Sequence, residues 1–166
     1  MKRSIILSIA LLLSGATLFA VAQDAELSLY TKITDAIKKH EPEWKLNRKA
    51  IMPNQVIIRW TSNKGRALVS VALLTSEAEA KQALKSRVDE LEDIPESKVS
   101  KTKLNEFGDE GYILRNDGVS GVNIIFRKSV YVAQVFGPSE DVARRFSQHI
   151  SDLLPTSNNS FNRSAD

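Results

Sequence analysis

The spacing of apolar residues along the chain predicts three helices. In residues 24–40 and 77–91, and again after Ser139, apolar positions recur every three or four residues with charged residues between them. Ser76 followed by Glu79 fits a capping box, in which side chains satisfy the free amides at the start of a helix. A proline follows the end of each segment: Pro42, Pro95 and Pro155.

Seven other segments are typical of strands, because they alternate in polarity or are rich in β-branched residues. They cover residues 44–50, 55–61, 67–74, 99–104, 112–115, 122–126 and 130–136. The first of these, residues 44–50, is short and mixed and is expected to form an edge-like strand. Between the second and third segments, Asn63 and Gly65 are residues that tolerate the positive φ of tight turns. The sequence therefore predicts a β-hairpin at this point.

The predicted order is helix, three strands, helix, four strands, helix. Because short turns join successive strands, the strands are expected to pair antiparallel. Helices packed on an antiparallel sheet make an α+β fold. We predict one α+β domain over residues 23–155, with about six or seven strands and three helices, after an N-terminal signal helix.

The first 22 residues have the organisation of a secretory signal peptide. Lys2 and Arg3 precede a nearly continuous apolar run, and small residues at Ala20 and Ala22 fit cleavage before Gln23. An uncleaved membrane anchor is the alternative, since the apolar span up to Ala22 is just long enough to cross a bilayer. The signal predicts an extracytoplasmic protein, either periplasmic or secreted. At the other end, the polar residues 156–166 are expected to form a disordered tail.

Removal of the signal changes the charge of the chain. The full sequence has 23 Lys+Arg and 20 Asp+Glu, and loss of Lys2 and Arg3 leaves 21 against 20. A nearly balanced charge argues against nucleic acid as a partner, and it leaves contact with a membrane to the signal segment alone if that segment is retained. The absence of cysteine excludes disulfides, thiolate metal sites and lipidation of a cysteine at the cleavage point.

The sequence lacks the motifs of most catalytic and cofactor sites. There are two histidines, and neither belongs to a zinc-ligand pair. The segment 118–121 (Gly-Val-Ser-Gly) differs from the Gly-x-Ser-x-Gly elbow of serine hydrolases, and phosphate-binding glycine loops do not occur. No metal and no cofactor is expected.

The acidic residues Asp109, Glu110 and Asp117 lie in predicted turns beside strands. Paired carboxylates can act in acid–base catalysis, so these three define a hydrolase-like alternative. The other interpretation is that they are solvated turn residues, with Asp109 making a local backbone hydrogen bond.

Four cationic or aromatic residues lie within or beside predicted strands: Arg59, Arg115, Arg127 and Tyr112. Alternation along a strand places Arg59 opposite Trp60, and Tyr112 opposite Arg115. We expect Val56, Ile58 and Trp60 to face the core, and Arg59 and Arg115 to share an open sheet face that receives an anionic or peptide partner. Alternatively, these arginines only screen the sheet from water.

The segments Phe107-Gly-Asp-Glu-Gly-Tyr112 and Phe126-Arg-Lys-Ser-Val-Tyr-Val132, followed by the last helix, resemble parts of small exported bacterial domains of unknown function. Sensor-like extracytoplasmic domains of bacterial kinases and related lipoproteins have a similar layout. The chain departs from that pattern at Ser129, where such hairpins carry Gly-Asn. The resemblance implies an antiparallel sheet closed by a helix, and it transfers no site residue.

Together these observations predict an exported, non-catalytic domain that binds an unknown protein, peptide or small ligand over the sheet or at a helix–sheet edge. The alternative is a hydrolase-like enzyme that uses the carboxylates of Asp109, Glu110 or Asp117.

Overall fold

The structure is a computed structural model that describes residues 26–93, 98–118 and 120–156. The predicted signal segment, with Ala20, Ala22 and Gln23, lies outside the described residues, and so does the predicted tail beyond Thr156. In the described ranges, no helix combines the length and the apolar character that a membrane crossing requires.

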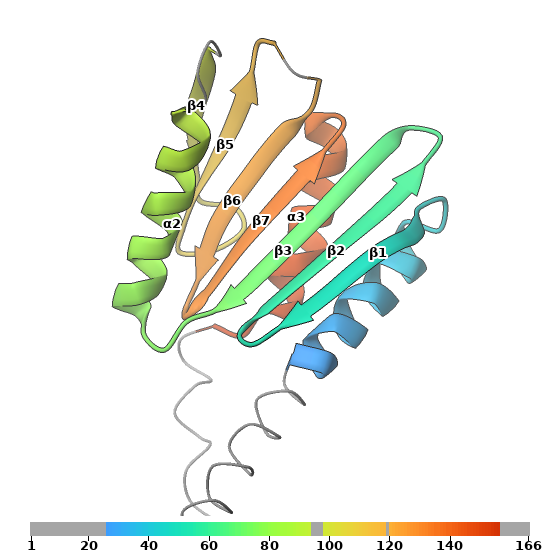
Figure 1. Ribbon diagram of the computed structural model, residues 1–166, viewed down its shortest axis with the longest axis horizontal. Coiled ribbons are helices and arrows are strands. Elements are labelled where there is room, and N and C mark those ends of the chain that lie inside the picture. Colours follow the sequence, from blue (N-terminus) through green and yellow to red (C-terminus); the bar gives the residue numbers. More distant parts are fainter. Residues whose placement is uncertain (1–25, 94–97, 119, 157–166) are drawn as a thin grey trace, which may run out of the picture.

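A seven-stranded antiparallel sheet forms the centre of the fold, with the strand order β1-β2-β3-β7-β6-β5-β4 (Figure 1). The strands are β1 (Lys45–Met52), β2 (Gln55–Ser62), β3 (Gly65–Leu73), β4 (Val99–Leu104), β5 (Glu110–Asn116), β6 (Val122–Lys128) and β7 (Tyr131–Gly137). The helices are residues 26–40, α2 (Glu77–Glu92) and α3 (Glu140–Leu153). The predicted α+β class and the predicted order of elements are confirmed.

Two antiparallel meanders lie side by side in this sheet. The first is β1-β2-β3 and the second is β4-β5-β6-β7, and they join where β3 pairs with β7. Helix α2 connects the two meanders, so β4 begins at the far edge of the sheet from β1. The central strands β3 and β7 therefore come from opposite halves of the chain.

The helices divide unequally between the two faces of the sheet. The helix of residues 26–40 and α3 lie behind the sheet in Figure 1, whereas α2 lies in front of it. The larger core is on the side with two helices, and Phe146 of α3 makes edge-on contacts with Trp44 and Trp60 there. Both tryptophans are buried, as are Val56 and Ile58, which confirms the predicted core side of β2.

A smaller core lies between α2 and the other face of the sheet. Its buried residues come from α2, β5, β6 and β7: Ala80, Leu84, Val88, Leu114, Ile125 and Val132. Alternate residues of β5 and β6 therefore serve different cores, with Ile113 and Ile124 facing α3 and their neighbours facing α2. Because both sides of these strands are covered, β5 and β6 are more apolar than β1 and β4.

The start of α2 uses the predicted cap in a modified form. The Ser76 hydroxyl accepts a hydrogen bond from the Glu79 backbone N–H at 3.2 Å, as a capping box requires. The Glu79 carboxylate does not return to Ser76 and instead accepts bonds from the backbone N–H and the hydroxyl of Thr75. The carboxylate of the capping box therefore binds one residue earlier than expected, at Thr75 in place of Ser76.

Two buried carboxylates attach the helix of residues 26–40 to the rest of the fold. Glu26 accepts a 2.7 Å hydrogen bond from the backbone N–H of Asn54, which lies in the β1–β2 turn with φ of 62°. Glu41, which is 4% exposed, accepts hydrogen bonds from the guanidinium of Arg145 in α3, at 2.8 Å from its Nε. Because a buried carboxylate needs such partners, both contacts fix where this helix lies on the sheet.

Candidate functional site

One half of the α2 side of the sheet is not covered by any described helix. Helix α2 packs against β5, β6 and β7, and Figure 1 shows β1, β2 and β3 bare on that side. The alternation of buried and partly exposed residues along β2 and β3 reflects the same division.

We call this surface the open face. It consists of the side chains of β1, β2 and β3 that point to the α2 side, together with two from β7, as the cross-strand register defines them. These residues are Lys45, Arg48, Ala50, Met52, Gln55, Ile57, Arg59, Thr61, Arg66, Leu68, Ser70, Ala72, Gln134 and Phe136.

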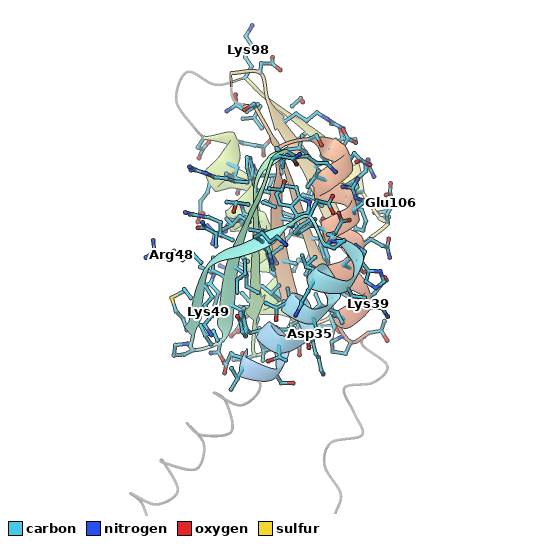
Figure 2. All side chains as sticks on the ribbon, turned by 90° about the vertical axis from the view of Figure 1, so that its right-hand side faces the viewer. Asp35, Lys39, Arg48, Lys49, Lys98 and Glu106 are labelled. Carbon is cyan, nitrogen blue, oxygen red and sulfur yellow. The ribbon has the colours of Figure 1, made fainter. Side chains whose placement is uncertain are left out.

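Three arginines give the open face most of its charge. Arg48, Arg59 and Arg66 are all exposed, and Arg48 lies directly opposite Arg59 on the neighbouring strand. Figure 2 shows Arg48 projecting to the α2 side, away from the helix of residues 26–40 and α3. Among the described residues no carboxylate lies within 4.0 Å of these three guanidinium groups, and the open face contains no acidic residue.

An apolar strip lies between these arginines and α2. Ile57, Leu68 and Phe136 are each partly exposed, and Met52 is exposed at the end of β1. The ring of Phe136 lies over Gly121, where a Cβ atom would come within 2.4 Å of it. The face thus offers apolar area next to cationic groups, which is the composition of many protein-binding surfaces.

A pocket of about 210 Å³ lies where the open face meets α2. Polar side chains line it from both sides, including Gln55, Ser70 and Gln134 from the sheet and Arg87 from α2. The Gln55 amide donates a 3.0 Å hydrogen bond to the Ser70 hydroxyl, and Arg87 forms an exposed ion pair with Glu90. This pocket has room for one polar side chain at the margin of the open face.

Arg115 does not share the open face with Arg59, so that expectation was wrong. The cross-strand register carries the face of Arg59 through Leu68 and Phe136 to Leu114. The following residue, Arg115, therefore points to the α3 side. Alternation along one strand cannot show this, because the relation between distant strands depends on the pairing of all the strands between them.

The guanidinium of Arg115 holds the start of α3. It donates two hydrogen bonds to one carboxylate oxygen of Glu140, at 2.6 and 3.0 Å. Arg144 binds the other oxygen of Glu140 at 2.9 Å and also pairs with Glu106. The hydrogen bonds from Arg115 and then from Arg144 hold the pKa of Glu140 below its ordinary value. Arg115 is thereby placed in a structural network.

Arg127 has a local structural contact of its own. It pairs with Asp109 at 2.9 Å and donates a 3.1 Å hydrogen bond to the Ser129 carbonyl. Asp109 in turn accepts a 2.8 Å hydrogen bond from the backbone N–H of Ser129, which has φ of 54°. These contacts hold the β6–β7 turn in a left-handed conformation that an L-residue adopts at a cost.

Tyr112 lies on the α2 side, beside the helix and away from Arg59. Its hydroxyl donates a 2.8 Å hydrogen bond to Glu110, and this bond, more than burial, raises the pKa of Tyr112 above its ordinary value. The two residues line a groove of about 540 Å³ between α2 and strands β4 and β5, together with Lys81 and Lys101. The phenol therefore remains neutral and is unsuited to act as a base.

The three carboxylates of the hydrolase alternative do not converge. Asp109 is engaged by Arg127 and Ser129, and Glu110 accepts the hydrogen bond from the Tyr112 hydroxyl. Asp117 follows the other end of β5, about 23 Å from Glu110 at the usual rise per strand residue. Within residues 26–93, 98–118 and 120–156, no three His, Asp or Glu side chains are grouped as a metal site would require.

Arg48 and Arg66 are absent from the sequence-based prediction, although the sequence contains a signal for them. Between Trp44 and Ser76 there are six lysines and arginines and not one aspartate or glutamate. A strand meander without a single acid cannot neutralise its own charge. Four of those six cations, Lys45, Arg48, Arg59 and Arg66, lie together on the open face.

Comparison of the chain with models of known protein families, with curated proteins and with solved structures found no match.

Proposed function

We propose that this chain is an exported, non-catalytic binding domain whose open face receives an acidic segment of a protein partner. The observation that carries this proposal is the placement of Arg48, Arg59 and Arg66 on an uncovered sheet face that has no acid of its own. The proposed extracytoplasmic location rests on the signal-like segment 1–22.

The opposition of Arg48 and Arg59 supports an anionic partner. Like charges directly opposite each other on antiparallel strands destabilise a sheet, so this pair weakens the isolated domain. A guanidinium group can bind a carboxylate through two parallel hydrogen bonds, and a partner carboxylate between the two arginines would remove the repulsion. The adjacent Ile57, Leu68 and Phe136 supply apolar area that a protein segment can bury.

A protein partner is favoured over other polyanions by the composition of the face. Nucleic-acid and lipid-headgroup sites depend mainly on charge, whereas here a strip of apolar side chains runs beside the arginines. The hydrolase alternative gains no support from the geometry, because Asp109, Glu110 and Asp117 are held apart.

The test is the affinity of a labelled acidic peptide, built from repeats of Glu-Glu-Val-Val, for the full chain. We expect saturable binding that weakens as salt is added, because the contacts are exposed ion pairs. The triple variant Arg48→Glu/Arg59→Glu/Arg66→Glu should lose about tenfold or more in affinity.

The control is Lys32→Glu/Lys38→Glu/Lys39→Glu, which makes the same change of net charge at exposed positions of the helix 26–40. It should bind the peptide as the unmodified chain does. An equal loss of affinity for the peptide in both triple variants would contradict the proposal. So would tighter binding to anionic lipid vesicles or to a DNA duplex than to the peptide.

A further inference from the structure

The β1 edge of the sheet suggests how an acidic segment would be held, and this inference rests on the proposed function. β1 is an outer strand of eight residues, paired with β2 on one side only. All of its residues except Ile51 are exposed. An edge strand presents a row of backbone N–H and C=O groups to which another strand can pair.

The cations of β1 point to both sides of the sheet. Arg48 lies on the open face, whereas the ammonium group of Lys49 lies 4.5 Å from the centre of the Tyr30 ring, on the side of the helix 26–40. Lys45 lies opposite Thr61 and is a further cation of the open face. None of the three has a carboxylate within 4.0 Å among the residues that the structure describes.

The other edge strand of the sheet, β4, differs from β1 in that one of its lysines is paired with a carboxylate. Its Lys101 pairs with Glu92 of α2 at 2.6 Å and lies 5.7 Å from the ring centre of Tyr112. That edge therefore has a carboxylate of its own from α2, the helix next to it. The cations of β1 lack such a carboxylate, so β1 repels a second copy of itself but attracts an acidic strand.

We propose that the partner segment adds to β1 as an eighth strand: an extended, acidic segment whose backbone pairs with the edge and whose alternate side chains meet Arg48 on one side and Lys49 on the other. Addition of a strand to a sheet edge derives affinity from backbone hydrogen bonds and specificity from alternate side chains. The register irregularity between Leu46 and Arg48 limits regular pairing to the part of the strand from Arg48 to Met52.

Lys49 separates strand addition from docking on the open face alone. Lys49→Glu changes the charge on the far side of the sheet, so a partner confined to the open face would not sense it. Strand addition predicts that this variant lowers the affinity for the Glu-Glu-Val-Val peptide about fivefold or more. The matched single variant Lys103→Glu, at an exposed position of the β4 edge, should leave the affinity unchanged.

Backbone methylation of the peptide gives the second readout. In an added strand only alternate N–H groups point toward β1, and the Glu-Glu-Val-Val repeat can present either set to the edge. N-methylation of one set should therefore be tolerated, whereas methylation of both sets should abolish binding. Undiminished binding of the peptide methylated at both sets, or no effect of Lys49→Glu, would overturn strand addition. If the peptide still binds and the arginine variants still weaken it, the proposed function stands without strand addition. If the peptide does not bind at all, both fail.

Discussion

Arg48 and Arg59 lie directly opposite each other on β1 and β2, on a sheet face without a carboxylate. This pairing is unfavourable for the isolated fold, since cross-strand neighbours of like charge repel. In a domain that must be stable without disulfides, such a pair is best explained by what it binds. The arrangement thus links stability to function at one place in the sheet.

The first prediction concerns stability. Arg59→Glu converts the repulsive pair with Arg48 into an attractive one, so the free energy of unfolding should rise by about 0.2–1 kcal/mol. Urea denaturation at low salt measures this change, and added salt should reduce it.

Two controls isolate the pair. Arg66→Glu, whose cross-strand neighbour is Thr61, should give a smaller increase. The double variant Arg48→Glu/Arg59→Glu restores a like-charged pair and should lose the gain. A double variant as stable as Arg59→Glu would contradict the prediction.

The second prediction concerns Glu140 and pH. Arg115 and Arg144 hold its pKa below the ordinary value, so this carboxylate stabilises the fold above its unfolded pKa of about 4.3, and the stabilisation is lost as pH falls through the lower folded pKa. Glu140→Gln should therefore destabilise the protein at pH 7, by less than about 1 kcal/mol per partly exposed ion pair. The difference from the unmodified chain should disappear in acid.

The control for this prediction is Glu77→Gln, the equivalent first residue of α2, which has no ion pair within 4.0 Å among the described residues. Both substitutions remove a negative charge from a helix N-terminus. The additional loss of unfolding free energy in Glu140→Gln therefore measures the contribution of the ion pairs with Arg115 and Arg144. Equal losses at pH 7 would show that the arginine contacts contribute nothing measurable.

The third prediction concerns the buried Glu41. Its carboxylate accepts hydrogen bonds from Arg145 and lies 3.5 Å from the Nε2 atom of His149. Arg145→Met leaves that carboxylate without its main donor, which should cost roughly 1–3 kcal/mol of unfolding free energy. The adjacent Arg144→Met removes only more exposed pairs and should cost less than about 1 kcal/mol. Urea denaturation measures both losses. Equal losses of unfolding free energy in Arg145→Met and Arg144→Met would contradict the claim that Arg145 stabilises the fold through the buried Glu41 carboxylate.

Much of the fold follows from local patterns in the sequence. Alternation along β2 identifies Trp60 as a core residue and Arg59 as an exposed one, and both are found so. Ser76 and Ser139 begin their helices because a hydroxyl can accept a hydrogen bond from a backbone amide three residues later. Such features depend only on neighbouring residues.

The candidate site depends on relations that local patterns do not contain. Whether Arg115 and Arg59 lie on the same side of the sheet depends on how β3 pairs with β7, two strands from opposite halves of the chain. Arg48 was not predicted because the irregularity after Leu46 breaks the alternation of β1. The open face itself exists because α2 packs over only one half of the sheet, and the amphipathic pattern of α2 does not say over which strands it lies.

The decisive measurement is a titration of the isotope-labelled chain with the Glu-Glu-Val-Val peptide, followed through its amide chemical shifts. We expect the largest changes on β1, β2 and β3, including Ile57, Arg59 and Leu68 of the open face, and no change on α3. Changes concentrated on α3 or in the groove beside Tyr112 would contradict this expectation, as would the same pattern of changes in the Arg48→Glu/Arg59→Glu/Arg66→Glu variant.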